Sequence, residues 1–341
     1  MKKLILYSAV ALLTLSCASQ KKAVVSKNVA SYMNLITSED LKANLTVIAS
    51  DEMEGRDTGS KGQKKAGVYL IDQYKKNAIP YPKGATSYFQ NIPADYLNAK
   101  YHENLSDSEN IWAFIEGSEK PEEIVVVSAH YDHVGVKNGE VYNGADDDGS
   151  GTVALVSIAK AFEKAKEEGN GPKRSILILH MTGEEHGLHG SRFYSEHPLF
   201  PLANTITDVN IDMIGRRDEF HANSNNYIYL IGSDYLSSDL YKICEDANKN
   251  YVHLDIDYKY NDKSDPNRFY YRSDHYNFAK NGIPSVFLFN GTHEDYHKPT
   301  DEVSKIEFDA LQKRTQLAFA IAWELANREQ KPIVDKTDDG K

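Results

Sequence analysis

Cysteine is scarce in this sequence: two residues, Cys17 and Cys244, occur among 341. Cys17 directly follows an apolar N-terminal segment, so Cys244 is the one cysteine expected within the fold. A framework of intrachain disulfide bonds is therefore excluded, even for a compartment that would permit one. Stability must come from a hydrophobic core, with bound metal as a further source.

Positive charge is also in short supply. Lys and Arg number 39 against 50 Asp and Glu, which gives a formal net charge of −11. A nucleic-acid-binding protein requires a basic face, so we expect no nucleic-acid partner. The hydrophobic fraction of 40% and the charged fraction of 26% are ordinary for a globular protein that can bury a core.

The chain has no apolar run near its N-terminus that is long enough to be a good membrane-spanning helix. The run "LILYSAVALLTL" follows Lys2 and Lys3. At about a dozen residues, against the roughly 20 that a spanning helix needs, it is typical of a secretory signal. Ser16 before Cys17 resembles a bacterial lipobox.

We therefore expect residues 1–16 to be a signal peptide and Cys17 to be the lipidated N-terminus of the mature chain. This predicts a bacterial lipoprotein of the cell envelope, anchored to the membrane on its periplasmic or outer-membrane face. Secretion without a lipid is the alternative.

The rest of the chain reads as one domain. Residues 18–37 are polar and Lys-rich and predict a flexible tether, residues 38–330 the domain, and residues 331–341 a polar tail. Continuous apolar runs predict strands covered on both faces. These runs are 123–130, 175–182, 207–214, 226–233 and 283–290. Helical patterns lie between them, which indicates an α/β sandwich.

Potential metal ligands and acid–base groups follow these predicted strands. The first run ends at His130, the second leads into Glu184 and Glu185, and the third carries Asp212. The fifth leads to "HEDYHKPTD", which contains His297. Ligands of open α/β sheets bind beyond the carboxyl ends of the strands. The functional site is expected there.

Two of these motifs contain carboxylates that need an explanation. In "NGADDDGSG" (143–151), three adjacent aspartates repel one another unless cations lie among them. A solvated loop with one helix-capping aspartate is the simpler interpretation, but it accounts for only one of the three. Asp212 lies inside an apolar run, where a carboxylate requires a cation or several hydrogen-bond donors.

The segment "SAHYDHVG" is weaker on its own. In an extended backbone Asp132 points the same way as His130, so its carboxylate can accept from the second imidazole nitrogen of a metal-bound histidine. Taken alone, this short pattern favours a structural histidine without a metal.

Together the motifs resemble a known family. In order, H-x-D, G-A-D-D-D-G-S-G, T-G-E-E, N-I-D-M and D-Y-H-x-P-x-D are similar to those of the co-catalytic zinc aminopeptidases of the bacterial leucyl-aminopeptidase (aminopeptidase S) type. Glutaminyl cyclases and glutamate carboxypeptidases are related to that family. The resemblance covers about residues 40–325 and implies a three-layer α/β/α sandwich around a mixed, largely parallel sheet.

The resemblance also implies two Zn²⁺ per chain and a role for each motif residue. His130 and Asp212 would hold one zinc, and Glu185 and His297 the other. Asp147 would bridge both, with a cis peptide bond to Asp148. Glu184 would be the general base and acid, acting on a zinc-bridging water.

Further residues are candidates for positioning or for substrate binding. Asp132 would orient His130, and Asp274 would orient site residues or bind the substrate amine. Tyr270 or Tyr271 in "RFYYRSDH" would hydrogen-bond the developing oxyanion, with ordinary core packing as the alternative for both.

The expected activity is removal of the N-terminal residue from peptide substrates. A glutaminyl cyclase with one zinc is one alternative, and a non-catalytic binding lipoprotein on the same fold is the other. The complete set of five ligands and Glu184 favours hydrolysis with two metals. The sequence indicates neither the oligomeric state nor the preferred N-terminal residue.

Overall fold

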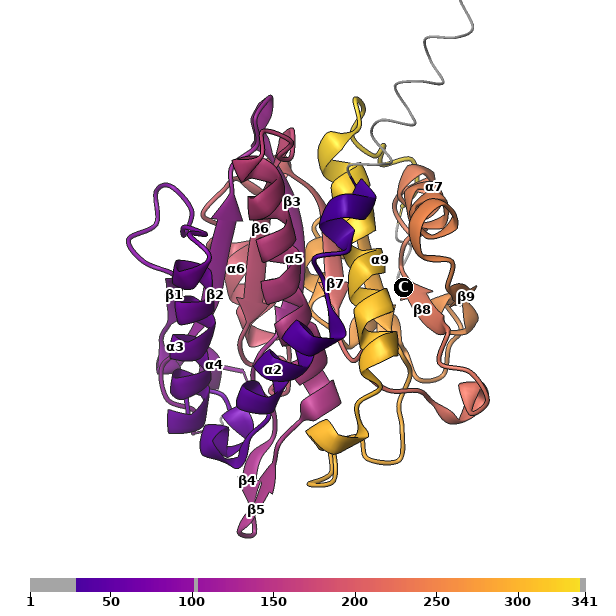
Figure 1. The fold of residues 1–341 in the computed structure, drawn as a ribbon. Helices are drawn as coiled ribbons and strands as arrows, with labels where there is room; N and C mark the ends of the chain where they lie inside the picture. Colours follow the sequence, from indigo (N-terminus) through magenta and orange to yellow (C-terminus); the bar gives the residue numbers. More distant parts are fainter. Residues whose placement is uncertain (1–28, 101–103, 338–341) are drawn as a thin grey trace, which may run out of the picture.

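The computed structural model describes residues 29–100 and 104–337, which form one mixed sheet between two layers of helices (Figure 1). The eight strands run in the order β1-β2-β6-β3-β7-β10-β8-β9. Their bounds are β1 Phe89–Ile92, β2 Ser108–Ile115, β3 Lys120–His130, β6 Arg174–Met181, β7 Thr205–Ile211, β8 Tyr227–Ile231, β9 Asp255–Asp257 and β10 Ser285–Phe289.

The middle of the sheet is parallel and its flanks are mixed. β3 pairs in parallel with β6 and β7, and β7 pairs in parallel with β10. β2 and β8 run antiparallel to their inner neighbours. The carboxyl ends of the four central strands therefore meet at one edge of the sheet, beside the small hairpin of β4 (Gly135–Lys137) and β5 (Glu140–Tyr142) (Figure 1).

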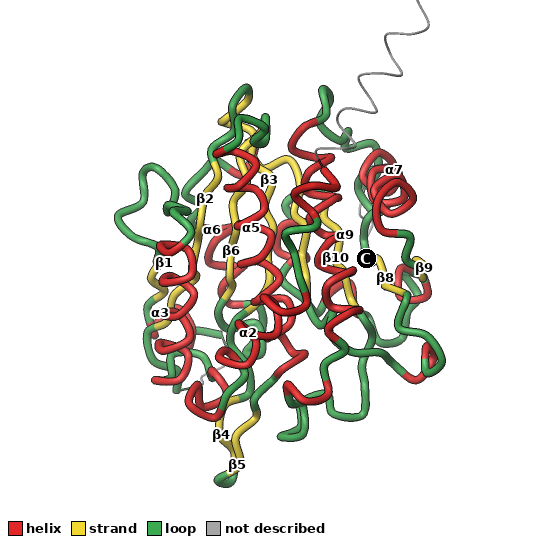
Figure 2. The backbone as a smooth tube through the Cα atoms, in the orientation of Figure 1, coloured by secondary structure: helices red, strands yellow, loops and turns green. Residues whose placement is uncertain are grey.

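Both faces of the sheet are buried, as the continuous apolar runs predict. In β6, Ile176 and Ile178 belong to the core on one face, whereas Leu177 and Leu179 belong to the core on the other. The first face is covered by the larger group of helices (Figure 2). These are α2 Ser38–Ile48, α3 Lys61–Lys76, α5 Gly151–Glu167, α7 Ser238–Ala247 and α9 Phe308–Asn327.

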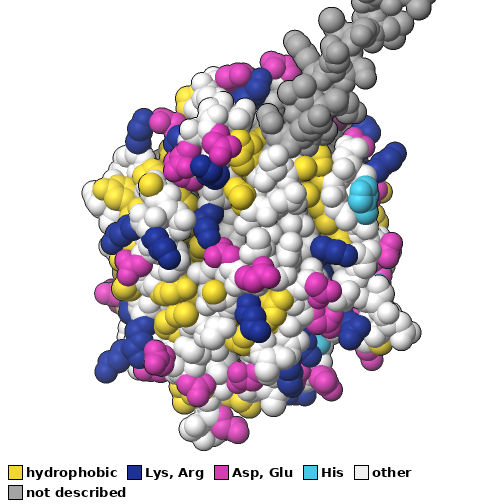
Figure 3. Space-filling model, viewed as in Figure 1, with side chains coloured by type: hydrophobic (Ala, Val, Ile, Leu, Met, Phe, Trp, Pro, Cys, Tyr) yellow, Lys and Arg dark blue, Asp and Glu magenta, His cyan; other side chains and the backbone are white. Residues whose placement is uncertain are grey.

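Shorter helices cover the opposite face. They are α6 (His189–Glu196) and α8 (His275–Ala279), and α4 (Ala94–Asn98) lies near α6. The expected three-layer sandwich is therefore confirmed. On the helical face drawn in Figure 3, cationic and acidic side chains are interspersed rather than segregated.

The end of the predicted tether packs on the domain instead of leaving it. Val29 and Ile36 are fully buried in the main core. Tyr32 stacks on Trp323 of α9 at a centroid distance of 5.7 Å. Residues 29–37 are thus folded, because apolar side chains are spaced through a segment whose overall composition is polar. The predicted signal peptide, Cys17 and residues 18–28 lie outside the described residues.

Candidate metal centre

The candidate ligands reach one place from separate strands. His130 is the last residue of β3, Glu184 and Glu185 follow β6, and Asp212 directly follows β7. The sequence places Asp212 inside a strand, but the strand ends at Ile211 and the aspartate lies just beyond it. Because the three strands are parallel neighbours, these side chains meet at the same edge of the sheet.

Asp147 lies at the centre of the cluster. One carboxylate oxygen, Oδ1, is 3.3 Å from Nε2 of His130, and the other, Oδ2, is 3.0 Å from Nε2 of His297. Its peptide bond to Asp148 is cis, as the family resemblance implies. The two oxygens of one buried carboxylate thus face two different histidines.

Each of these histidines has a second acidic neighbour. Nε2 of His297 is 3.0 Å from Oε2 of Glu185, and Nε2 of His130 is 3.7 Å from Oδ1 of Asp212. The structure therefore brings together all five residues to which the resemblance assigns metal binding.

Glu184 and Glu185 have opposite electrostatic environments. Burial raises the pKa of Glu184 well above its ordinary value, with the charges of Asp212 and Glu185 adding to the shift and His130 opposing it. Burial also favours the neutral form of Glu185, but His133 and His297 outweigh it and lower the pKa of Glu185 to about 2. The raised pKa of Glu184 suits a group that carries protons, and the lowered pKa of Glu185 suits a group that stays negatively charged.

The histidines show the reciprocal shifts. Burial favours a neutral His130, but the charge of Glu184 and the carboxylates of Asp147 and Asp212 raise its pKa well above the ordinary value. Burial of His297 is likewise outweighed by Asp147 and Glu185, which raise the pKa of His297 to about 10. The cluster binds positive charge strongly.

Several buried polar atoms at this site require a cation. Within the described residues, Nε2 of His130, Oδ2 of Asp147, Oδ2 of Asp148 and Oε1 of Glu185 have no hydrogen bond of normal geometry. Uncompensated buried polar atoms are costly. Imidazole nitrogens and carboxylate oxygens are the donor set of catalytic zinc sites. The residues present therefore fit zinc.

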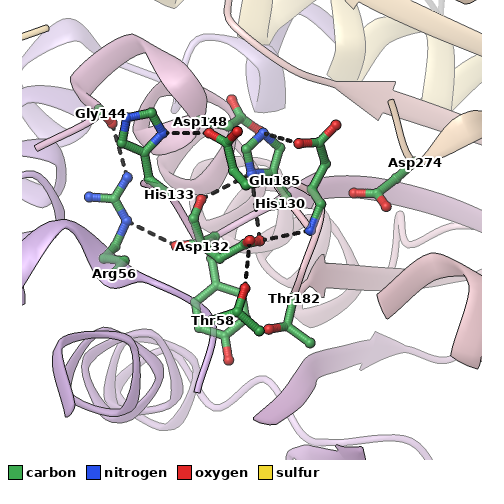
Figure 4. Close-up of polar contacts among 12 residues, drawn as sticks. Arg56, Thr58, His130, Asp132, His133, Gly144, Asp148, Thr182, Glu185 and Asp274 are labelled. Carbon is green, nitrogen blue, oxygen red and sulfur yellow. Dashed lines mark hydrogen bonds and ion pairs between the residues drawn. The ribbon is translucent and has the colours of Figure 1, made fainter. Parts of the chain in front are cut away.

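Asp132 meets His130 in a different way from the one expected. Nδ1 of His130 contacts the backbone carbonyl of Asp132 at 3.0 Å, whereas the Asp132 carboxylate is 3.7 Å away. That carboxylate instead accepts hydrogen bonds from the Thr58 hydroxyl and from the N–H of Glu184 (Figure 4). The chain leaves the extended conformation after His130, so the alternation rule no longer holds there.

Sequence reasoning missed His133 and Asp148. Nδ1 of the fully buried His133 is 2.8 Å from Oε1 of Glu185, and Asp148 forms a possible ligand group with His130 and Asp212. The repeated histidine in "HYDHVG" was the available signal for His133. Asp148 also accepts hydrogen bonds from the N–H groups of Gly151 and Met213, so part of its role is structural.

A buried arginine holds the two ligand-bearing loops together. The Arg56 guanidinium donates to the carbonyls of Tyr131, Asn143 and Gly144, at 2.9, 2.7 and 3.0 Å (Figure 4). Gly144 has a φ of 54°, and a Cβ atom there would lie 2.5 Å from the His133 ring. Glycine is needed here because the backbone passes so close to a buried histidine.

The two candidate tyrosines lie in different surroundings. Tyr270 is 3% exposed and packs in the aromatic cluster beneath the site, in agreement with the packing alternative. Tyr271 lines the open cavity beside Glu184. Tyr296, which sequence reasoning missed, lines both cavities that reach Glu184. Its position directly before His297 was the available signal.

Asp274 lies behind the cluster rather than in a cavity. Its carboxylate is fully buried and accepts a hydrogen bond from the Ser191 hydroxyl. Burial raises the pKa of Asp274 to about 7. The charge of Asp274 also contributes to the raised pKa of Glu184.

Two cavities converge on Glu184. One is an open cleft of about 470 Å³ that also reaches Glu185 and His297. The other is a recess of about 30 Å³ that reaches Asp147 and Asp212 and has apolar walls. Those walls are Met213, Phe269, Phe287 and Phe289. The cluster is thus reachable from solvent.

Comparison with known proteins identifies the family. Residues 110–322, more than half of the chain, match the family described as Peptidase family M28. A vacuolar membrane protease of Emericella nidulans is 33% identical over 149 residues, which are 43% of this chain and 14% of the fungal protein. The chain thus matches only a small part of that relative.

Solved structures show the same fold. The LapA aminopeptidase of Legionella pneumophila superposes with a TM-score of 0.67 at 22% identity, covering 97% of this chain and 81% of LapA. BSAP, a zinc aminopeptidase from Bacillus subtilis, gives a TM-score of 0.65 at 16% identity, covering 90% and 99%. At these identities the likeness is one of fold.

The relatives correct the expected localisation. They are fungal vacuolar membrane proteases from Emericella nidulans and Aspergillus fumigatus, which are eukaryotic proteins rather than bacterial envelope lipoproteins. A basic and apolar N-terminus is a general targeting pattern, so the prediction of a bacterial envelope lipoprotein rested on too little. Among the described residues, none of the helices has the length and apolarity of a membrane span.

The family predicted from the five motifs is therefore confirmed. The prediction that the chain is a zinc metallopeptidase is confirmed by the same match. The match extends over β3, β6, β7 and β10, which are the strands that position the candidate ligands. The chain belongs to Peptidase family M28.

Proposed function

We propose that the chain is a dinuclear zinc aminopeptidase that hydrolyses the N-terminal peptide bond of peptides. The observation that carries the proposal is the position of Asp147, whose two carboxylate oxygens face His130 and His297 separately. A carboxylate placed in this way can bridge two metal ions, whereas a site with one metal needs no bridging carboxylate.

In this proposal His130 and Asp212 hold one zinc, Glu185 and His297 hold the other, and Asp147 contributes to both. Zinc supplies Lewis-acid chemistry, which acidifies water and polarises a peptide carbonyl. His133 orients Glu185, because its ring nitrogen lies 2.8 Å from that carboxylate.

Glu184 is the proposed proton carrier. It takes a proton from the attacking water and delivers it to the leaving amine, and its raised pKa suits a group that must do both. The Glu184 N–H donates to the Asp132 carboxylate at 3.2 Å, which fixes the start of this loop. Tyr296, at the junction of the two cavities, is the proposed donor to the developing oxyanion.

The shape of the site supports an exopeptidase. The recess beside Asp212 is narrow and apolar, and it opens through Glu184 into the wider cleft. An apolar side chain at the free N-terminus would point toward the recess, which at about 30 Å³ must widen to hold it, while the rest of the peptide leaves through the cleft. The names of LapA and BSAP as aminopeptidases agree with this assignment.

The test uses the zinc-loaded full chain and a mixed peptide pool, half of it N-acetylated, with products read by mass spectrometry. Loss of single residues from free N-termini only is the expected result. Cleavage that ignores acetylation would reject the aminopeptidase assignment. Ammonia loss from N-terminal glutamine without any hydrolysis would favour the one-zinc cyclase instead.

A further inference from the structure

The open cleft has a basic outer part, which is unusual in a chain with a net charge of −11. The cations that line it are Lys100, Arg192, Arg272 and Lys280. Lys100 precedes β2 and Arg192 lies on α6. Arg272 and Lys280 lie before and after α8. Among the described residues, the acidic side chains that line the same cleft are Glu184 and Glu185, at its inner end.

Three of these cations have no carboxylate at ion-pair distance anywhere in the described part of the chain. Nε of Arg192 donates to the Tyr96 hydroxyl at 3.0 Å, and Nη2 of Arg272 donates to the Tyr296 hydroxyl at 3.3 Å. Lys280 is exposed at the end of α8. On the face drawn in Figure 3, by contrast, cations and carboxylates are interspersed.

The charges of Arg192 and Lys100 are close enough to Lys280 to repel its ammonium group. Partial burial lowers the pKa of Lys280, Glu196 acts against that shift, and the charges of Arg192 and Lys100 add to it. An anion placed among these cations would relieve their repulsion. The cleft therefore favours a negatively charged ligand in its outer part.

The two cavities determine which part of a peptide meets these cations. Arg272 and Tyr296 line both the recess and the cleft, so they lie at the junction near Glu184. Arg192 and Lys280 line only the open cleft. If the N-terminal side chain points toward the recess, these two cations face the residues beyond the scissile bond.

We propose that the cleft selects peptides that carry a carboxylate on the C-terminal side of the bond to be cleaved. This inference rests on the proposed aminopeptidase function and adds a substrate class to it. The carboxylate has two possible sources, the free C-terminus of a di- or tripeptide and the side chain of Glu or Asp. Nε and Nη2 of Arg192 contact Tyr96 and His189, which leaves Nη1 to donate to either carboxylate, and Lys280 adds a point charge.

The test compares kcat/KM within matched substrate pairs for the zinc-loaded full chain. Leu-Ala-Ala as the free acid against its amide tests the C-terminal source. Leu-Glu-Ala-amide against Leu-Gln-Ala-amide tests the side-chain source. We expect the carboxylate member of at least one pair to be preferred by roughly twofold to fivefold at low salt, as for partly exposed ion pairs. This preference should shrink at high salt.

Variants assign the preference to the cleft. Lys280→Gln and Arg192→Gln should each move the preferred ratio toward one, and Lys280→Glu should reverse it. Lys242→Gln is the matched control, because Lys242 lies on α7, is 72% exposed and lines neither cavity. It should keep the wild-type ratio.

Equal kcat/KM within both pairs would overturn the inference while leaving the aminopeptidase proposal intact. A preference that survives in Lys280→Gln, Lys280→Glu and Arg192→Gln would also overturn it. If no peptide with a free N-terminus were cleaved, the proposed function would be rejected, and this inference would be rejected with it.

Discussion

Nδ1 of His133 lies 2.8 Å from Oε1 of Glu185. His133 is fully buried, and its ring packs against the backbone at Gly144. The imidazole therefore has little freedom to rotate, and we infer that it limits the orientations open to the carboxylate. An outer residue of this kind controls how well a metal ligand is presented.

Replacing His133 should weaken metal binding without preventing folding. We expect His133→Gln to lose about 10- to 100-fold in zinc affinity, as is typical when a partner that orients a ligand is removed. Competition with a chelator of known affinity measures this. The matched control is His197→Gln, since His197 is exposed at the end of α6 and should leave zinc affinity unchanged. Equal affinities in both variants would contradict the orienting role.

Arg56 should matter for stability because it connects four backbone carbonyls from separate segments of the chain. It is fully buried and donates to Ile48, Tyr131, Asn143 and Gly144. Lysine cannot reproduce this planar set of donors. We expect Arg56→Lys to lower the free energy of unfolding by about 2–4 kcal/mol.

Urea unfolding in the presence of a chelator measures the Arg56 effect apart from metal binding. Arg217→Lys is the control, because Arg217 is 42% exposed and pairs with Glu307 at the surface. An Arg56→Lys protein as stable as this control would show that the four hydrogen bonds contribute little.

Asp208 should make stability depend on pH. It is fully buried in β7, and burial raises the pKa of its carboxyl well above the ordinary value, against the effect of the Ser128 hydroxyl. The folded protein therefore keeps a proton that the unfolded chain has released. The stability due to this group is present below about pH 4 and is lost as pH rises toward the folded-state pKa.

Asp208→Asn removes that proton uptake while keeping the shape of the side chain. The free energy of unfolding of the variant should therefore rise relative to that of wild type between about pH 4 and pH 7. The rise should be about 1.4 kcal/mol for each unit by which the folded-state pKa exceeds the unfolded-state pKa within that range. Denaturation of both metal-free proteins across this range measures the difference. A difference independent of pH would contradict the protonated state of Asp208.

Glu184→Gln should slow hydrolysis strongly without affecting folding. An amide cannot accept the proton of water, so we expect kcat to fall about 10²- to 10⁴-fold. Initial rates on an unblocked leucyl peptide measure this effect. Near-normal kcat in the variant would show that another group carries the proton.

Much of this architecture was predictable, because the candidate site residues come directly after strands that the sequence shows as continuous apolar runs. The runs of β3, β6, β7 and β10 are apolar on both faces, and parallel pairing then requires their carboxyl ends to meet. Edge strands β1 and β9, with 4 and 3 residues, bury too little to leave such a pattern.

What escaped prediction depends on backbone geometry outside regular elements. His133 reaches Glu185 only because the chain turns after β3, and an alternation rule cannot describe a turn. Tyr32 and Ile36 are apolar residues in a polar segment, and their burial depends on a distant contact with α9. Tyr296 reaches both cavities through a loop whose shape the sequence does not reveal.

The division of labour between Glu184 and Glu185 is tested most directly by counting bound zinc per chain in three proteins. Wild type and Glu184→Gln should each hold two zinc ions, because Glu184 moves a proton and binds no metal. Glu185→Gln should hold one or none, because it loses a ligand. One zinc in wild type, or loss of zinc in Glu184→Gln but not in Glu185→Gln, would contradict this assignment.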